Sequence, residues 1–310
     1  MIKDLENGSS GTGEFFCQKV TEGTTKAGKA YQSVVLRDCT GLIDGKAWDV
    51  ATVGLKEGEY YRIDYSVQDY NGALQLRVNQ RELLDKESID LSQFNPRSKY
   101  DITAMFKDIV RLLESVENPW LKKLIVRFLK NEEALNAYKN SSAAVKVHHA
   151  FVGGLVQHTR GVMLMANTAA KIYEGVDRDL LLTAAFFHDV GKLQEIAQYP
   201  ENRFTAYGVL VGHVTLSSIT VDHLCESIEG FPPKLKFLLM HCLLAHHGEL
   251  EYGSPVKPAL KEAIILSALD GLDADVEIFD EAYEKGGYCS PLGTTVLREE
   301  EFECLEHPLY

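Results

Sequence analysis

One stretch in the middle of the chain decides the fold: Ala184-Ala185-Phe186-Phe187-His188-Asp189-Val190-Gly191-Lys192. An apolar helical run ends here in an adjacent imidazole and carboxylate, followed by a glycine and a lysine. Such polar groups are costly to bury unless they are paired or bind a metal ion. An ordinary helix end explains the same residues, with His188 capping carbonyls and Gly191 as the left-handed residue. Taken alone, the stretch leaves a metal site and a capped helix end open.

Further residues that can bind a metal ion lie on both sides of this stretch. His158 stands thirty residues earlier on another apolar helical pattern, which leaves room for a turn between two antiparallel helices. Later residues of this kind, each on or at the end of its own predicted helix, are His213, His246, His247 and Asp270. This supply of ligands favours the metal site over the capped helix end.

The order of these residues resembles the HD superfamily of metal-dependent phosphohydrolases. Three longer segments extend the match: His148-His149-Ala150-Phe151-Val152-Gly153-Gly154-Leu155-Val156-Gln157-His158-Thr159, then His188-Asp189-Val190-Gly191-Lys192, then Ala245-His246-His247-Gly248-Glu249-Leu250-Glu251-Tyr252-Gly253-Ser254-Pro255. With the N-terminal region described below, they resemble the YhaM-type 3′-to-5′ exoribonucleases of low-GC Gram-positive bacteria. The resemblance covers nearly the whole chain.

The resemblance implies a divalent metal centre with two ions. The four-ligand pattern of the superfamily matches His158, His188, Asp189 and Asp270 position by position. The additional ligands expected for a second ion are His213 and His246, with Asp189 bridging the two ions. Ligands without thiolate disfavour a structural zinc site and suit manganese, iron, magnesium, nickel or cobalt. Manganese is the first candidate that the resemblance implies.

Several neighbouring residues have two open interpretations. His247 can exchange roles with His246, because two adjacent imidazoles at a helix end cannot easily face one ion. His149 either binds metal or orients substrate. Asp273, three residues after Asp270 on the same helix face, either orients a ligand or is a surface carboxylate. Lys192 is expected to neutralise a phosphate oxygen in catalysis, and it also suits the negative end of a helix.

Composition limits the class of protein. The chain has 310 residues, of which 45% are hydrophobic, and a formal net charge of −13. A charge of this sign argues against coating nucleic acid through bulk electrostatics, so any such contact must be local. No apolar stretch reaches the roughly eighteen residues needed to cross a bilayer, and the N-terminus lacks a signal peptide. The six cysteines form no CxxC pair. We expect a cytoplasmic protein that does not enter membranes.

The first part of the chain has the pattern of a small β-barrel. Five short strands are expected near residues 14–20, 31–38, 41–48, 60–68 and 73–80, separated by turn signals such as Asn71-Gly72. Five strands in about seventy residues predict an OB fold. Alternation places Val34 and Leu36 inside the barrel.

The same alternation gathers four residues on one outer surface of the barrel: Tyr31, Arg37, Lys46 and Trp48. Aromatic rings beside cations are what single-stranded nucleic acid uses for stacking and phosphate contact. The alternative is that Tyr31 and Trp48 merely cover a barrel end or an interface. A resemblance of residues 36–49 to anticodon-binding OB modules favours nucleic acid.

A change of period separates this barrel from the rest of the chain. We expect an OB-fold domain over residues 1–84, a polar linker over 85–100, an all-helical HD domain over 101–285 and a tail over 286–310. The predicted fold class is therefore a multidomain protein, with an all-β OB barrel followed by an all-α domain.

By resemblance, the expected activity is metal-dependent hydrolysis of single-stranded RNA from its 3′ end, releasing nucleoside monophosphates. Single-stranded DNA is a second candidate substrate, and a homo-oligomer is possible in principle. Two other classes remain open: an HD-type hydrolase of free or cyclic nucleotides, and a single-strand DNA-binding replication factor with a structural metal. Relaxase-type HD proteins share one of the segments, but they are generally larger.

Overall fold

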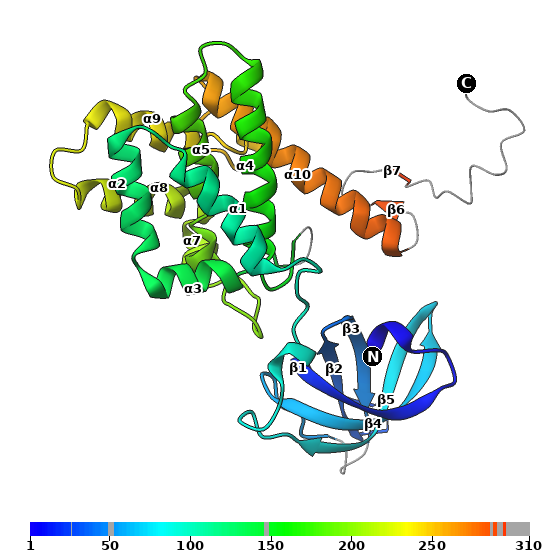
Figure 1. Cartoon of the computed structure of the whole chain (residues 1–310). Coiled ribbons are helices and arrows are strands. Elements are labelled where there is room, and N and C mark those ends of the chain that lie inside the picture. The colour runs from blue at the N-terminus through cyan, green and yellow to red at the C-terminus, as the bar shows by residue number, and fades with distance from the viewer. Residues whose placement is uncertain (26, 49–52, 146–148, 286–287, 290–293, 296–310) are drawn as a thin grey trace, which may run out of the picture. The chain divides into compact units, whose positions relative to one another are not determined.

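A computed structural model describes the chain in two compact units (Figure 1). One unit comprises Met1–Arg97 with Tyr199–Asn202, and the other comprises Ser98–Gln198 with Arg203–Tyr310. The description leaves out residues 26, 49–52, 146–148, 286–287, 290–293 and 296–310. His148 of the family-like segment and most of the expected tail therefore lie outside the described residues.

The first unit contains a closed barrel of five strands. These are β1 (Ser10–Thr24), β2 (Ala30–Asp38), β3 (Gly41–Ala47), β4 (Tyr60–Tyr70) and β5 (Ala73–Leu83). They pair in the order β1-β2-β3-β5-β4, with β4 closing against β1 and with β3 parallel to β5. This is the OB topology, and the predicted fold class is confirmed.

Alternation along the strands builds the barrel core. Val34 and Leu36 are buried as predicted, together with Ile43 of β3. Gly45 of β3 also faces inward, where a Cβ atom would lie 2.9 Å from the Val34 side chain. Tyr31 stacks on Trp48 outside the barrel with ring centroids 4.9 Å apart, and Lys46 Nζ lies 5.1 Å from the Tyr31 ring centroid.

Arg37 corrects the predicted outer surface. Its side chain is only 3% exposed, so it does not join the surface group formed by the half-buried Tyr31 and Lys46 and the exposed Trp48. Its Nε donates to the Phe94 carbonyl at 3.0 Å and its Nη2 donates to Asn95 Oδ1 at 2.9 Å. Alternation failed here because residues that follow the barrel in sequence cover this end of β2.

The segment after β5 extends the barrel unit beyond the expected boundary at residue 84. It contains a short 3₁₀ turn, η2 (Leu91–Gln93), followed by Phe94, which is fully buried against Phe16 and Tyr60. Its ring lies 4.8 Å from that of Tyr60 in an edge-on arrangement. This aromatic contact explains why the first unit runs to Arg97 although the segment is polar overall.

The second unit is helical. Its helices are α1 (Ile102–Glu114), α2 (Pro119–Leu129), α3 (Glu132–Asn140), α4 (Gly154–Ile172), α5 (Arg178–Phe187), α6 (Lys192–Glu195), α7 (Ala206–Leu210), α8 (His213–Glu226), α9 (Pro233–Leu244) and α10 (Lys261–Lys285). The side chains of Asp101 and Asn118 cap α1 and α2 as their sequences suggest. A small pair of strands, β6 (Tyr288–Cys289) and β7 (Thr294–Thr295), follows α10. No described helix has the length and apolarity that a membrane crossing requires.

Helix α5 forms the centre of the helical unit. Every residue from Leu180 to Phe187 is buried, and α5 contacts α4, α9 and α10 among others. A helix that is apolar on all sides belongs inside a protein. Because α5 ends within the core, the His188-Asp189 pair that follows it is held in the interior rather than at the surface.

Arg37→Ala is expected to destabilise the barrel by about 1–3 kcal/mol, because the Phe94 carbonyl and the Asn95 side chain lose a buried charged donor. Hydrogen–deuterium exchange of the barrel amides in the full chain measures this change. The control is Arg77→Ala, an exposed arginine on β5 of the same barrel, whose effect should stay within about 0.5 kcal/mol. Equal protection in Arg37→Ala and the unaltered protein would contradict a structural role.

Candidate metal centre

Five parts of the helical unit supply the candidate ligands. The His188-Asp189 pair follows α5, His158 lies within α4, His213 begins α8, the His246-His247 pair follows α9, and Asp270 lies on α10. Gly191 permits this convergence, because a Cβ atom there would lie 2.2 Å from the His213 carbonyl oxygen. Its φ of −62° also shows that it is not the left-handed helix cap of the alternative interpretation.

The first cluster consists of His158, His188 and Asp270, with Asp189 beside it. His158 Nε2 lies 3.0 Å from both His188 Nε2 and Asp270 Oδ1. Asp189 Oδ2 lies 3.5 Å from His158 Nε2 and 3.4 Å from His188 Nε2. Neighbouring ligands of an octahedral ion, each about 2.1 Å from it, are separated by about 3.0 Å. The four groups therefore have the spacing of a ligand set.

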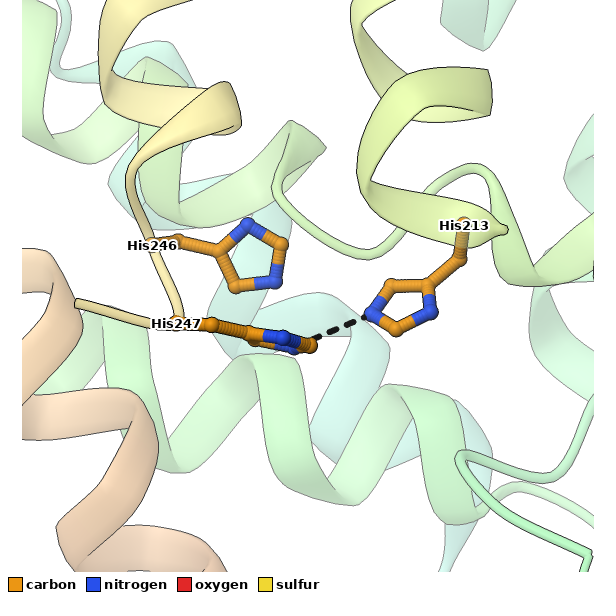
Figure 2. A group of neighbouring side chains, drawn as sticks. All are labelled: His213, His246 and His247. Atoms are coloured by element: carbon orange, nitrogen blue, oxygen red, sulfur yellow. Dashed lines mark hydrogen bonds between the residues drawn. The ribbon is translucent and has the colours of Figure 1, made fainter. Parts of the chain in front are cut away.

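The second cluster consists of His213, His246 and His247 (Figure 2). Ring nitrogens of all three lie within 4.8 Å of one another, and those of His213 and His247 are 3.2 Å apart. Figure 2 shows the His246 and His247 rings arriving from the end of α9 and turning toward His213. Both adjacent imidazoles thus lie near His213, because α9 ends at Leu244 and the residues after it form a turn; whether the two can face one ion stays a prediction.

The Nδ1 atoms determine which nitrogen carries the proton. Each Nδ1 lies against an atom that can only accept a hydrogen bond when the carboxylates are ionised: Asp273 Oδ2 for His158, Ala185 O for His188, Glu195 for His213, Leu243 O for His246 and Tyr252 O for His247. In a neutral ring the proton therefore belongs on Nδ1 and the lone pair on Nε2.

These tautomers leave lone pairs facing each other. The Nε2 atoms of His158 and His188 are 3.0 Å apart, and those of His213 and His247 are 3.2 Å apart. Two lone pairs at such distances repel unless a cation lies between them, so neither contact is a hydrogen bond between neutral rings. His246 Nε2 is buried without a hydrogen-bond partner. The donor set fits divalent metal on these observations.

Asp189 lies between the two clusters. Its Oδ2 faces the first cluster, while its Oδ1 lies 3.4 Å from His213 Nε2 and 3.9 Å from His246 Nε2. Neither oxygen accepts a hydrogen bond of ordinary geometry, although Lys192 Nζ forms an ion pair with Oδ2 at 2.7 Å. Asp189 therefore has one oxygen facing each cluster, and its bridging role stays a prediction.

Electrostatics keep Asp189 and His246 in the ionisation states that metal ligands need, but not His188. Burial acts to lower the pKa of His188, yet Asp189 and Asp270 outweigh it and raise that pKa to about 10, so a metal ion has to displace a proton from this ring. Burial acts to raise the pKa of Asp189, but Lys192 and His188 outweigh it and hold that pKa well below its usual range. Burial lowers the pKa of His246 well below its usual range, which keeps this imidazole neutral. Asp189 is therefore a carboxylate and His246 a lone-pair donor at neutral pH.

Glu195 is a site residue that sequence reasoning missed. Its Oε1 accepts from the His213 backbone N–H at 2.9 Å, and its Oε2 lies 2.9 Å from His213 Nδ1. Burial acts to raise the Glu195 pKa, yet the bonds from His213 outweigh it and lower that pKa. The sequence gave one weak indication of this role: Glu195 lies three residues after Lys192. A single glutamate among polar residues did not identify it as a site residue.

His149 and Asp273 lie outside both clusters but touch the first. Asp273 Oδ2 lies 2.8 Å from His158 Nδ1 and 3.0 Å from His149 Nε2. Asp273 therefore contacts the candidate ligand His158, and its orienting role stays a prediction. Lys192, in contrast, faces Asp189 and is almost completely buried. The expected contact of Lys192 with a phosphate therefore has to be made from its ion pair with Asp189.

Fold and site together define a class of protein: an OB-fold barrel followed by a helical metal-binding domain of the HD type. The family model of the HD domain matches residues 155–275. The 3′-5′ exoribonuclease YhaM of Bacillus subtilis (strain 168) is 30% identical over 269 residues, which cover 86% of this chain and 85% of that protein. The chain belongs to this family of YhaM-type exoribonucleases.

Solved structures resemble the barrel region. The second OB-fold domain of replication protein A from Methanococcus maripaludis is 26% identical and covers 29% of this chain and 97% of its own, with a TM-score of 0.24. An OB domain from Methanosarcina mazei is 22% identical and covers 33% of this chain and 94% of its own, with a TM-score of 0.26.

Divalent metal is expected to stabilise the helical unit against unfolding. An ion that binds only the folded chain adds about 2.7 kcal/mol at a free concentration of one hundred times its Kd. Thermal unfolding of the full chain, with manganese and with a chelator, measures the shift. His246→Leu fills the same buried space with an apolar side chain but removes the ring nitrogen. This variant should reduce the metal-dependent shift of the unfolding midpoint. An unchanged midpoint with every divalent metal would contradict the assignment.

Proposed function

We propose that this protein is a metal-dependent 3′-to-5′ exoribonuclease that hydrolyses single-stranded RNA to nucleoside monophosphates. Single-stranded DNA is the second proposed substrate. The main support for this proposal is that Asp189 lies between two clusters of imidazole nitrogens, in a chain that belongs to the YhaM family. A paired centre of this kind suits hydrolysis of a phosphodiester, because the attacking and leaving oxygens both develop charge.

The proposed cofactor is a pair of divalent ions, with manganese first and iron, magnesium, nickel or cobalt as alternatives. His158, His188 and Asp270 would hold one ion and His213, His246 and His247 the other, with Asp189 shared. Bound ions of this type supply a water of lowered pKa and polarise a phosphoryl oxygen. Imidazole and carboxylate ligands without thiolate support this group of metals.

Lys192 is the proposed catalytic cation beside Asp189. Burial acts to lower its pKa, but Asp189 outweighs burial and raises it, so the ammonium group stays protonated at neutral pH. Charge accumulates on the phosphoryl oxygens in the transition state, and a fixed cation in a water-poor site is effective there. Asp189, held ionised by the same lysine, keeps its oxygens toward the ligand nitrogens.

The barrel is proposed to bind the single strand. Tyr31 and Trp48 form a stacked pair with Lys46 over the Tyr31 ring, and Trp48 is 39% exposed. Bases of any identity can stack on such rings while a nearby cation contacts phosphate. Arg37 is no longer part of this proposed surface, because it is buried.

Assembly is proposed from the exposed residues of α10, and location from the sequence. Exposed apolar residues recur along one side of α10, namely Ile264, Leu272, Val276 and Phe279. A stripe of this kind suits a helix that packs against another copy of the chain, so we propose a homo-oligomer. A cytoplasmic location is proposed from the sequence expectation alone.

Cleavage of a 5′-labelled single-stranded RNA tests the proposed activity. With manganese, the unaltered protein should give a ladder that shortens from the 3′ end, and Asp189→Asn should give none. Cleavage of mononucleotides but not of RNA would favour the nucleotide hydrolase instead. Binding of single strands with no cleavage under any metal would favour a binding factor with a structural metal.

Trp48→Ala is expected to weaken RNA binding, because one base loses its stacking partner at a cost of about 1–3 kcal/mol. Fluorescence anisotropy with a short labelled oligonucleotide measures the affinity, and calorimetric titration confirms unchanged metal binding. Trp48→Phe is the matched control and should retain much of the affinity. An Ala variant that binds RNA like the unaltered protein would refute this surface.

A further inference from the structure

A chain of three side chains extends from the first cluster away from the proposed metal. His158 presents Nε2 to the cluster and Nδ1 to Asp273, whose Oδ2 lies 2.8 Å away. The same oxygen lies 3.0 Å from Nε2 of His149. His149 and His158 are each 2% exposed, and the Asp273 side chain is 17% exposed. One carboxylate oxygen therefore joins a proposed ligand to a second, buried histidine.

Glycine makes room for Asp273. A Cβ atom at Gly161, on α4, would lie 2.0 Å from Asp273 Oδ1, a distance that no side chain tolerates. Gly161 lies three residues after His158 on the same helix, so it opens the helix surface beside the ligand. In contrast, a Cβ atom at Gly271 of α10 would meet nothing within 4 Å. The close approach of the Asp273 carboxylate to α4 depends on Gly161.

The backbone before α4 is folded to bury His149. His149 has a φ of 58°, a conformation that residues other than glycine seldom adopt. A Cβ atom at Gly154 would lie 2.0 Å from the His149 carbonyl oxygen, and Gly153 has a φ of 84° with Ile102 in the way of any side chain. The Gly-Gly pair of the family-like segment thus lets the chain turn back over His149. Such unusual backbone is retained where the surrounding structure requires it.

We propose that Asp273 and His149 are positioning residues for the metal ligand His158. Asp273 accepts the His158 Nδ1 proton and thereby keeps the Nε2 lone pair directed at the first cluster. His149 donates its Nε2 proton to the same oxygen and fixes the carboxylate in that orientation. His149 is therefore not a metal ligand. The inference rests on the metal centre of the proposed function, and not on RNA being the substrate.

A third metal ion does not explain this group of residues. The two contacts of Asp273 Oδ2, at 2.8 and 3.0 Å, have the usual length of hydrogen bonds. An ion here would need the Nδ1 of His158, while its Nε2 already faces His188 and Asp270. His158 would then have to lose both of its ring protons. Hydrogen bonds account for the geometry without that step.

Two pairs of variants test the role of Asp273 in the full chain. Asp273→Ala removes the carboxylate, and its control is Asp275→Ala, an exposed aspartate on the same helix with the same change of charge. Gly161→Ala displaces the carboxylate, and its control is Gly271→Ala, where space is open. Calorimetric titration of the metal-free protein with manganese chloride measures affinity and stoichiometry. Asp273→Ala and Gly161→Ala should weaken one class of site by about 10- to 100-fold, and the controls should not.

The thermal midpoint of the metal-free Gly161→Ala protein separates positioning from folding. Alanine favours a helix more than glycine does, so a purely structural effect would leave this midpoint unchanged or raised, with metal affinity unchanged. Weakened metal binding in a protein that still unfolds cooperatively supports positioning. If Gly161→Ala does not fold, Asp273→Ala decides the question. Affinity equal to that of the unaltered protein in Asp273→Ala would overturn the proposal.

A second comparison tests His149. His149→Gln keeps an N–H donor at a similar reach, whereas His149→Leu keeps a comparable bulk without a donor. Because both side chains begin with a CH₂ group, both variants meet the same backbone strain at this position. The Leu variant should bind manganese more weakly than the Gln variant, with the number of ions unchanged. Loss of a whole ion from His149→Leu would overturn the proposal, since it would make His149 a ligand. Because manganese binding is the readout, these outcomes stand even if the protein does not cleave RNA.

Discussion

The structure depends on one electrostatic constraint: buried imidazole nitrogens with lone pairs face each other at 3.0 Å and at 3.2 Å. Neutral rings do not remain in such an arrangement without a cation between them. The central helix α5 carries His188 into the core because it is apolar on all sides. The absence of a side chain at Gly191 then lets α8 bring His213 close. The fold therefore assembles a site whose facing nitrogens need a cation between them, as a bound divalent metal ion would supply.

The carboxylates around the candidate metal centre fall into two groups by what they contact. Asp189 and Asp270 face the ligand nitrogens directly, while Glu195 and Asp273 accept the Nδ1 protons of His213 and His158. Such outer partners fix the ring orientation and raise the basicity of the ligand. They also add negative charge, which suits a chain with a formal net charge of −13 whose site is completed by cations.

Local signals predicted most of the fold. Alternation placed Val34 and Leu36 inside the barrel, and the change to a helical period predicted the all-helical unit that follows it. Contacts between distant residues were not encoded locally. Arg37 is buried because Phe94 and Asn95, more than fifty residues later, close over it.

The candidate site was also predicted only in part from local signals. A repeated order of His and Asp indicated the ligands, but the sequence could not show that the turn after Ala245 brings both His246 and His247 to His213. Glu195 was missed because its partner His213 lies eighteen residues later in the chain. The sequence also did not identify Gly161, because the need for a glycine there depends on where Asp273 of α10 lies in the folded chain.

Anomalous X-ray scattering from crystals of the manganese-loaded protein tests the central claim most directly. The account predicts two peaks: one between the Nε2 atoms of His158 and His188, the other beside those of His213 and His247, with Asp189 between the peaks. Crystals soaked in manganese that show the same ring arrangement and no peak at either place would contradict it, because protons rather than metal would then hold the facing nitrogens together.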